Sequence, residues 1–170
     1  MPLTVLGIDP GTRYLGWGVV RSEGTRVVHV GHGVVHAGLE APLEDRLVAI
    51  DDALAELLER LRPSEAAVES IFFSRDAQAA SKLGHARGVI LLRLKRAGVQ
   101  VAEYAPTRVK KALTGRGLAE KAQVCSFVTA LLGLPRPPPH DASDALALAI
   151  AHARTCALPP ALRRAMSQGS

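Results

Sequence analysis

Hydrophobic and polar residues alternate with a strand-like period over the first forty residues. Apolar runs at 3–8, 15–19 and 27–35 are separated by short turns, which allow neighbouring strands to pair antiparallel. In the second run, large residues alternate with Gly16 and Gly18, so one face is apolar and the other is nearly bare. A bare face lets another part of the backbone come close. We therefore expect three antiparallel strands, the second with a surface suited to close packing.

Beyond residue 40 the spacing changes to a helical period. Leucine and isoleucine recur every three or four residues over 43–61, and Pro63 follows, which predicts an amphipathic helix that ends before the proline. After it we expect, in order, a strand over 66–73, a helix over 76–97, a strand over 99–104 and helices over 106–113, 119–132 and 141–155. This order of elements predicts an α/β domain in which helices flank a mixed sheet.

The length of the chain fits one such domain, which we place at residues 1–156. Residues 157–170 contain proline and arginine without periodicity, so we expect a disordered tail. No apolar run approaches the roughly 20 residues that a membrane span needs, and the N-terminus does not resemble a signal peptide. The sequence therefore predicts a cytoplasmic protein without membrane association.

Basic residues are concentrated in one part of the chain. The net charge is +5, but residues 75–121 carry 11 Lys or Arg against 3 Asp or Glu, whereas residues 1–74 carry 6 against 11. Such a segment indicates a polyanionic partner such as nucleic acid. The alternative is that these residues only solvate helix faces, and the charge pattern alone does not separate the two interpretations.

Four carboxylates occur where a solvated acidic side chain is not expected. Asp9 ends an apolar strand and Glu69 interrupts another, and a buried carboxylate is costly unless it is paired or binds a cation. Asp141 and Asp144 are three residues apart at the start of an apolar helix, which places both on one face. Each residue has an ordinary structural alternative: a turn, an exposed strand edge, a helix cap or a favourable helix-dipole interaction. Together, however, they predict one acidic site.

The ligand types in this predicted site favour a hard divalent cation. Carboxylates without a histidine or cysteine cluster suit Mg²⁺ or Mn²⁺. Two such ions about 4 Å apart can hold both the attacking and the leaving oxygen of a phosphodiester. An acidic metal site beside a basic surface is the combination that a nuclease requires.

The histidines and cysteines do not form a competing metal-binding pattern. His29, His32 and His36 lie on one predicted strand, whose alternation divides them between two faces. His140 precedes the last helix and could contact a metal or a phosphate, although a loop position beside a helix cap is the simpler interpretation. The two cysteines, Cys125 and Cys156, are far apart in helical segments. We interpret them as small buried hydrophobic residues, with a surface thiol as the alternative.

Several short motifs follow one another in a fixed order along the chain. They are GIDPGT at 7–12, VESIFF at 68–73, KLGHARG at 82–88, VKK at 109–111, AEK at 119–121 and DASDALA at 141–147. The ordered set, from about residue 3 to residue 155, resembles the RuvC family of bacterial crossover junction endodeoxyribonucleases.

The resemblance implies an RNase H-like fold, with three antiparallel strands followed by two parallel strands and with helices on both faces. It implies a homodimer that resolves four-way (Holliday) DNA junctions by paired symmetric nicks in recombination and repair, with RuvA and RuvB as branch-migration partners. By this resemblance the catalytic and metal-binding residues, for two Mg²⁺ or Mn²⁺ ions per subunit, are Asp9, Glu69, Asp141 and Asp144.

The resemblance also implies contacts with DNA. The family's basic contacts map onto Lys110 and Lys121, and its aromatic residue that stacks on a junction base maps onto Phe72. Some members carry His where Asp141 stands, so an accessory role for His140 stays open. The basic segment supplies four further predicted phosphate contacts, namely Arg75, Lys82, Arg87 and Lys111.

Three other classes of function share part of this pattern. A sugar-kinase or actin-like ATPase also opens with a strand and an Asp-x-Gly-Thr turn, but it needs two such domains and a second phosphate loop. An RNase H-like nuclease that processes ribosomal RNA has the same opening in a shorter chain. A DNA-binding module without catalysis would not need the complete acidic set.

Overall fold

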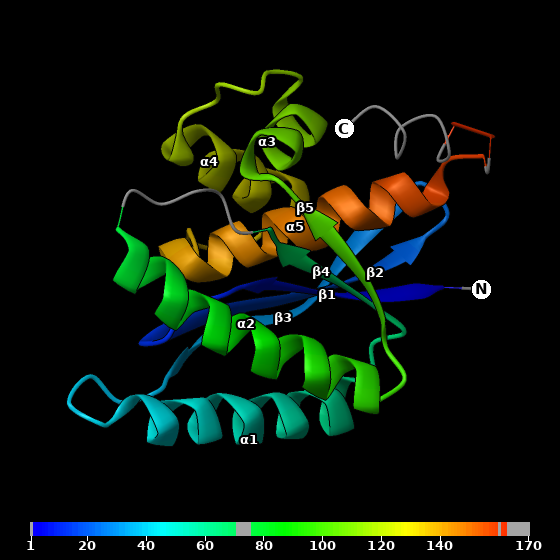
Figure 1. Cartoon of the computed structure of the whole chain (residues 1–170). Helices are drawn as coiled ribbons and strands as arrows, with labels where there is room; N and C mark the ends of the chain where they lie inside the picture. The colour runs from blue at the N-terminus through cyan, green and yellow to red at the C-terminus, as the bar shows by residue number, and fades with distance from the viewer. Residues whose placement is uncertain (1, 71–75, 160, 163–170) are drawn as a thin grey trace.

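Five strands form one mixed sheet whose spatial order is β3-β2-β1-β4-β5 (Figure 1). β1, β2 and β3 pair antiparallel, whereas β4 is parallel to β1 and β5 is parallel to β4. The computed structural model describes residues 2–70, 76–159 and 161–162. The strands are β1 (Leu3–Asp9), β2 (Tyr14–Glu23), β3 (Arg26–His36), β4 (Glu65–Glu69) and β5 (Gln100–Tyr104).

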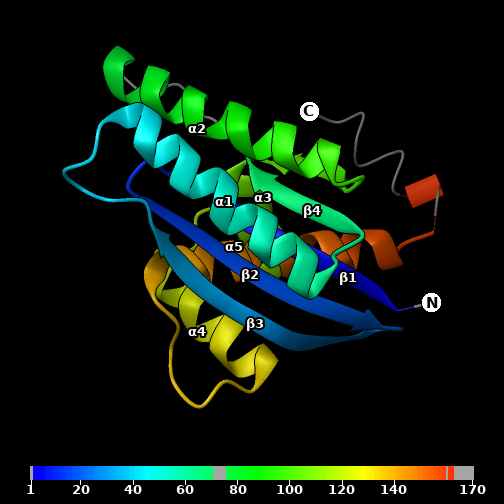
Figure 2. The ribbon, with the colours of Figure 1, turned by 90° about the horizontal axis from the view of Figure 1, so that it is seen from below.

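Helices cover both faces of this sheet, as Figures 1 and 2 show from two directions. One layer contains α1 and α2, and the other contains α3, α4 and α5. Their bounds are α1 (Leu43–Leu61), α2 (Ala77–Arg96), α3 (Pro106–Thr114), α4 (Lys121–Leu132) and α5 (His140–Ala157). The predicted fold class is therefore confirmed, and the observed element boundaries differ from the predicted ones by only a few residues.

Alternation along β1 divides the core into two parts. Leu6 and Ile8 pack with α1 and α2, including Ile90, whereas Val5 lies on the α5 side. The described part of β4 ends at Glu69, not at residue 73, and the predicted DNA contacts Phe72 and Arg75 lie outside the described residues. The division into a domain over 1–156 and a tail over 157–170 stays a prediction.

Three glycines allow α5 to lie against the centre of the sheet. A Cβ at Gly7 would lie 1.8 Å from the carbonyl oxygen of Ala145, and a Cβ at Gly16 would lie 2.0 Å from that of Asp141. At Gly18, a Cβ would come within 2.6 Å of the Leu146 side chain. The bare face predicted for β2 is thus confirmed, and β1 extends it. Because no side chain stands between the two backbones at Gly7 and Gly16, the sheet fixes the position of the α5 backbone directly there.

A β-bulge changes the predicted arrangement of the histidines on β3. Val19 pairs with Gly31 and Val20 with His29, so the register shifts by one residue at this point. An extra residue in one strand reverses the alternation beyond it. His29 Nε2 consequently lies 2.8 Å from His32 Nδ1, and the prediction that these two rings occupy opposite faces was wrong.

None of the helices in the described residues has the length and apolar composition needed to cross a membrane.

Candidate active site

Two of the predicted carboxylates end neighbouring parallel strands. Ile8 of β1 is in register with Val68 of β4, and each strand continues for one residue, to Asp9 and Glu69 respectively. Since adjacent parallel strands end at the same edge of the sheet, the two side chains lie close together, and their carboxyl groups hydrogen-bond to each other. Glu69 is therefore the last residue of its strand, not an interior residue as the sequence suggested.

The first turns of α5 bring the other two carboxylates to the same edge. Pro139 is the N-cap of α5, so Asp141 lies within the first turn and the alternative that it is the N-cap was wrong. Asp144 follows one turn later and is part of the wall of a cavity that also contains Asp9 and Glu69. The acidic group at the strand ends thus combines residues from positions 9, 69 and 144 of the chain.

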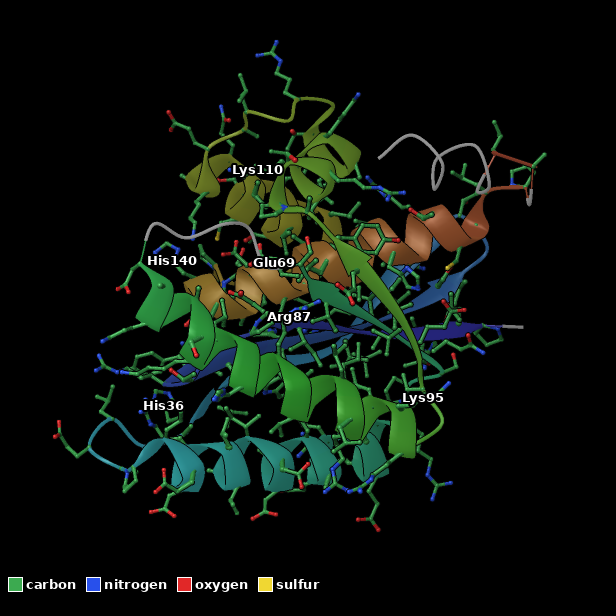
Figure 3. All side chains as sticks on the ribbon, in the orientation of Figure 1. His36, Glu69, Arg87, Lys95, Lys110 and His140 are labelled. Carbon is green, nitrogen blue, oxygen red and sulfur yellow. The ribbon has the colours of Figure 1, made fainter. Side chains whose placement is uncertain are left out.

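A cavity of about 300 Å³ lies between these acidic side chains and the helices α3 and α4. Two of the predicted DNA contacts, Lys110 and Lys121, form part of its wall, and Figure 3 shows Lys110 on the α3 side of Glu69. Its full lining is Asp9, Glu69, Pro106, Val109, Lys110, Lys121, Val124, Asp144, Ala147 and Leu148. The cavity therefore has an acidic floor with basic side chains at its edge.

Burial and mutual repulsion disfavour negative charge on this acidic floor. Burial, followed by the charges of Glu69, Asp144 and Asp141, raises the pKa of Asp9 to about 8. The pKa of Glu69 is also raised, chiefly by burial and then by Asp144, although its hydrogen bond with Asp9 acts in the other direction. Because ionisation of these carboxyl groups is unfavourable without a nearby positive charge, a bound cation would stabilise their charged form.

One lysine already compensates part of this charge. Lys121 Nζ lies 3.4 Å from Asp144 Oδ2, and its side chain is 72% exposed. Asp144 is also the main reason that the pKa of Lys121 is raised. The ammonium group is thus held at the cavity edge, positively charged and accessible from solvent.

Arg87, which the sequence predicts to contact a DNA phosphate, makes contacts within the protein in this structure. Its Nε donates to the backbone carbonyl of Glu69 at 3.2 Å, and its guanidinium group is paired with Glu103. The side chain is only 15% exposed. Arg87, which lies next to Glu69 in Figure 3, therefore links α2 to the ends of β4 and β5, and this contact fixes the strand end that carries Glu69.

The remaining predicted residues do not line the acidic cavity. Lys82 borders a separate depression near Thr12 and Asp76, and Lys111 is an exposed residue of α3. His140 is the first residue of α5 and lines a groove with His29 and His32. Among the residues that the structure describes, the acidic site therefore combines five predicted residues, three carboxylates and two lysines, and Asp141 lies close enough to affect the charge of Asp9.

A second polar cluster, at the other end of β4, was missed by the sequence analysis. His152 of α5 contacts Glu65 and Tyr104, and Cys156 lies beside it. The interpretation of both cysteines as buried hydrophobic residues was wrong, because both are only partly buried and Cys156 has polar neighbours. The available signal was the spacing of His152 and Cys156, which are four residues apart and so share one face of a helix.

The architecture and the acidic site together define a class. A mixed sheet with three antiparallel and two parallel strands, and with carboxylates at the ends of its two central parallel strands, is an RNase H-like domain with a nuclease-type acidic site. The family model "Crossover junction endodeoxyribonuclease RuvC" matches residues 5–152. The chain belongs to the RuvC family.

Individual relatives agree with this assignment. A crossover junction endodeoxyribonuclease RuvC from Sorangium cellulosum is 55% identical over 150 residues, which cover 88% of this chain and 84% of the relative. The RuvC structure from Thermus thermophilus has a TM-score of 0.82 at 40% identity, covering 91% of this chain and 95% of that one. The Thermus thermophilus RuvC in complex with a Holliday junction substrate has a TM-score of 0.83 at 38% identity, with the same coverage.

Proposed function

We propose that this protein is a divalent-metal-dependent endonuclease that resolves four-way DNA junctions by paired, symmetric nicks. The observation that carries the proposal is the cavity in which Asp9, Glu69 and Asp144 lie beside Lys110 and Lys121. Acidic groups suited to metal ions are placed within reach of basic groups suited to a phosphate backbone. The match to RuvC relatives over most of the chain supports the same reaction.

The residues of the cavity fit a pair of Mg²⁺ or Mn²⁺ ions. All the acidic donors are hard carboxylate oxygens, which these ions prefer. Burial and the neighbouring carboxylates raise the pKa of Asp9 and of Glu69 even though Lys121 lowers both, so a bound cation would offset charge that the lysine offsets only in part. We assign Asp9, Glu69 and Asp144 as ligands, with Asp141 as the fourth carboxylate. When bound, such ions supply positive charge to the phosphodiester and activate water for hydrolysis.

The side chains of the protein have separate tasks in this reaction. Lys110 and Lys121 bind the DNA phosphates beside the acidic floor and keep the scissile bond close to it. The pairing of Arg87 with Glu103 and with the Glu69 carbonyl holds the end of β4 in place. The neighbouring apolar wall, which includes Val109 and Leu148, limits access of bulk water.

A synthetic four-way junction with each strand labelled in turn tests the proposal. With Mg²⁺ or Mn²⁺ we expect two nicks at symmetry-related positions, whereas a linear duplex of the same sequence stays intact. Chelation of the metal should stop cleavage but leave junction binding. ATP hydrolysis, or cleavage of RNA alone, would contradict the proposal in favour of the ATPase or the RNA-processing nuclease.

Lysine substitutions at the cavity edge should weaken junction binding in a salt-dependent way. If about five phosphates are neutralised per subunit, log K falls with log salt with a slope near −4 to −5. Lys110→Ala or Lys121→Ala should each reduce that slope by about one and weaken binding about tenfold at 0.1 M salt. Fluorescence anisotropy of a labelled junction at several salt concentrations measures both quantities.

Arg60→Ala is the control, because it removes one positive charge from the exposed last turn of α1, outside the cavity and outside α2. Its affinity and slope should equal those of the wild type. An equal loss in all three variants would mean that only the net charge of the protein matters.

We also propose that the working form is a homodimer in which α2 meets its counterpart. The alternative is that the small residues of α2 serve only to pack this helix against the sheet. An added Cβ would meet nothing within 4 Å at Gly84 or at Gly88, so neither glycine packs against the sheet. Leu92, one turn further along the same stripe, is 53% exposed. Two symmetric cuts require two sites, and a helix face of small residues permits close approach. RuvA and RuvB remain the further partners that the family resemblance predicts.

Gly88→Glu should therefore convert the dimer to a monomer, because each subunit would bring a charged side chain into the interface. We expect sedimentation velocity at micromolar concentration to show the smaller species, and paired nicking to be lost. Ala130→Glu introduces the same charged side chain at an exposed position of α4, on the other face of the sheet. This variant is the control and should stay dimeric. A wild-type monomer that still cuts both strands would rule out the dimer.

A further inference from the structure

A mixed set of metal-binding side chains lies at the opposite end of β4 from the acidic cavity. Cys156 Sγ lies 3.4 Å from Glu65 Oε2 and 3.6 Å from His152 Nε2, and that nitrogen lies 2.6 Å from Glu65 Oε2. Among the residues that the structure describes, this is the only group of three His, Cys, Asp or Glu side chains whose ligand atoms all lie within 4.8 Å of one another.

We propose that Glu65, His152 and Cys156 form a binding site for a transition-metal ion, with Zn²⁺ as the expected ion. Zn²⁺ binds thiolate sulfur at about 2.3 Å and imidazole or carboxylate atoms at about 2.0–2.2 Å, so its tetrahedral ligands are roughly 3.3–3.6 Å apart. The two separations that involve Cys156 have these values. Only the contact between His152 and Glu65 must widen, by roughly 0.7 Å on the same basis.

The surroundings of His152 hold its ring in the orientation that metal binding needs. Nε2 points to the Glu65 and Cys156 side chains, while Nδ1 lies 2.8 Å from the hydroxyl oxygen of Tyr104. A metal-binding imidazole commonly donates its second N–H to an oxygen, which fixes the ring. Both Tyr104 and His152 are buried, so the ring has little freedom to turn away.

The site is also accessible to an ion from solvent. The Glu65 side chain is 29% exposed, and Cys156 is partly buried, whereas His152 is 7% exposed. A buried imidazole with two partly exposed ligands leaves a path for entry from solvent. Three protein ligands are the number found in zinc sites that keep an open fourth position.

The chemistry of the ligands separates this site from the acidic cavity. Thiolate and imidazole favour Zn²⁺ over Mg²⁺, whereas an all-carboxylate site favours the hard ions. Both sites use the same two elements, since Glu65 and Glu69 end β4 and Asp144 and His152 lie on α5. They are separated by roughly 12 Å, the length of eight residues of helix. The proposed ion would clamp the far end of α5 to the sheet without entering the reaction.

Protection of the two cysteines from alkylation tests the site in the wild-type protein. Cys125, which is partly buried on α4, serves as an internal control in the same molecule. Zn²⁺ at ten times its dissociation constant should slow iodoacetamide alkylation of Cys156 about tenfold and leave the alkylation rate of Cys125 unchanged. Mg²⁺ at the same concentration should protect neither cysteine. Mass spectrometry reads both rates. Equal protection of both cysteines, or of neither, would overturn the proposal.

Cobalt spectroscopy provides a second test that does not depend on activity. Co²⁺ bound to a thiolate gives a sulfur-to-metal charge-transfer band, which carboxylates in the acidic cavity cannot produce. The band should appear with about one equivalent of Co²⁺, persist in Cys125→Ser, and be lost in Cys156→Ser with folding checked by circular dichroism. Glu65→Gln should weaken it. A band that persists in Cys156→Ser would refute the site, as would its absence from the wild type.

Discussion

Asp9→Asn is expected to abolish junction cleavage while junction binding stays close to the wild-type value. The substitution removes one ionic ligand from the floor of the cavity but leaves Lys110 and Lys121 at its edge. Loss of several kcal/mol of charge stabilisation at the phosphodiester corresponds to a rate reduced at least about a thousandfold. Single-turnover cleavage and anisotropy binding, measured on the same junction, separate the two effects.

The same variant should be more stable than the wild type in metal-free buffer at high pH. The pKa of Asp9 is raised from 3.8 to about 8 in the folded protein, so between these pH values the folded state holds a proton that the unfolded state releases. This contribution to stability is fully present below about pH 4 and is lost as pH rises through about 8. Asparagine carries no ionisable proton, so the Asp9→Asn variant does not lose stability at this position as the pH rises. Each unit by which the pKa of Asp9 is raised corresponds to about 1.4 kcal/mol in the free energy of unfolding.

Thermal melting in chelator at pH 5, 7 and 9 measures the stability effect. The advantage of Asp9→Asn should grow with pH, and it should shrink when Mn²⁺ is added, because the ion stabilises only the wild-type site. Asp52→Asn, on the exposed side of α1, is the control and should change neither cleavage nor the pH dependence. Near-normal cleavage by Asp9→Asn would contradict the assignment of the acidic cavity as the catalytic site.

Gly7→Ala should destabilise the protein severely, although it adds a single methyl group. The new Cβ would lie 1.8 Å from the Ala145 carbonyl oxygen and 2.9 Å from the Ala149 nitrogen. Both are backbone atoms of α5, so no side-chain rotation can relieve the overlap. We expect a loss of at least about 3 kcal/mol, the upper end of the usual cost of overpacking. That loss would lower the melting temperature by roughly 6–12 °C.

The displaced helix should also affect catalysis, because α5 carries Asp141 and Asp144. The folded fraction of Gly7→Ala is therefore expected to cut slowly even below its melting temperature. Gly117→Ala is the matched control, since its Cβ would lie no closer than 3.6 Å to its neighbour, the Thr107 carbonyl oxygen. It should change stability by less than about 0.5 kcal/mol. A Gly7→Ala protein with wild-type melting would show that α5 can move away from the sheet at little cost.

The sequence determined the elements and the chemistry of the acidic site. Apolar periodicity located the strands and helices, because a half-buried strand repeats every two residues and an amphipathic helix every three or four. The bare face at Gly16 and Gly18 was also visible, because a glycine between large residues leaves an obvious gap in the pattern. Asp9 and Glu69 were identifiable because a carboxylate in an apolar run is costly without a cation or a partner, and Asp141 and Asp144 because their spacing at the start of an apolar helix places both on one face.

The tertiary structure decided which of these residues meet. That Glu69 ends β4 beside Asp9 follows from the parallel register of two strands some sixty residues apart, and no local pattern encodes such a pairing. The bulge in β3 brought His29 and His32 together against their expected alternation. Arg87, which the sequence grouped with the phosphate contacts, is paired in the structure with the Glu69 carbonyl and the Glu103 side chain. The cluster of Glu65, His152 and Cys156 became visible only when α5 lay across β4, because metal ligands are defined by distances in space and not by spacing along the chain.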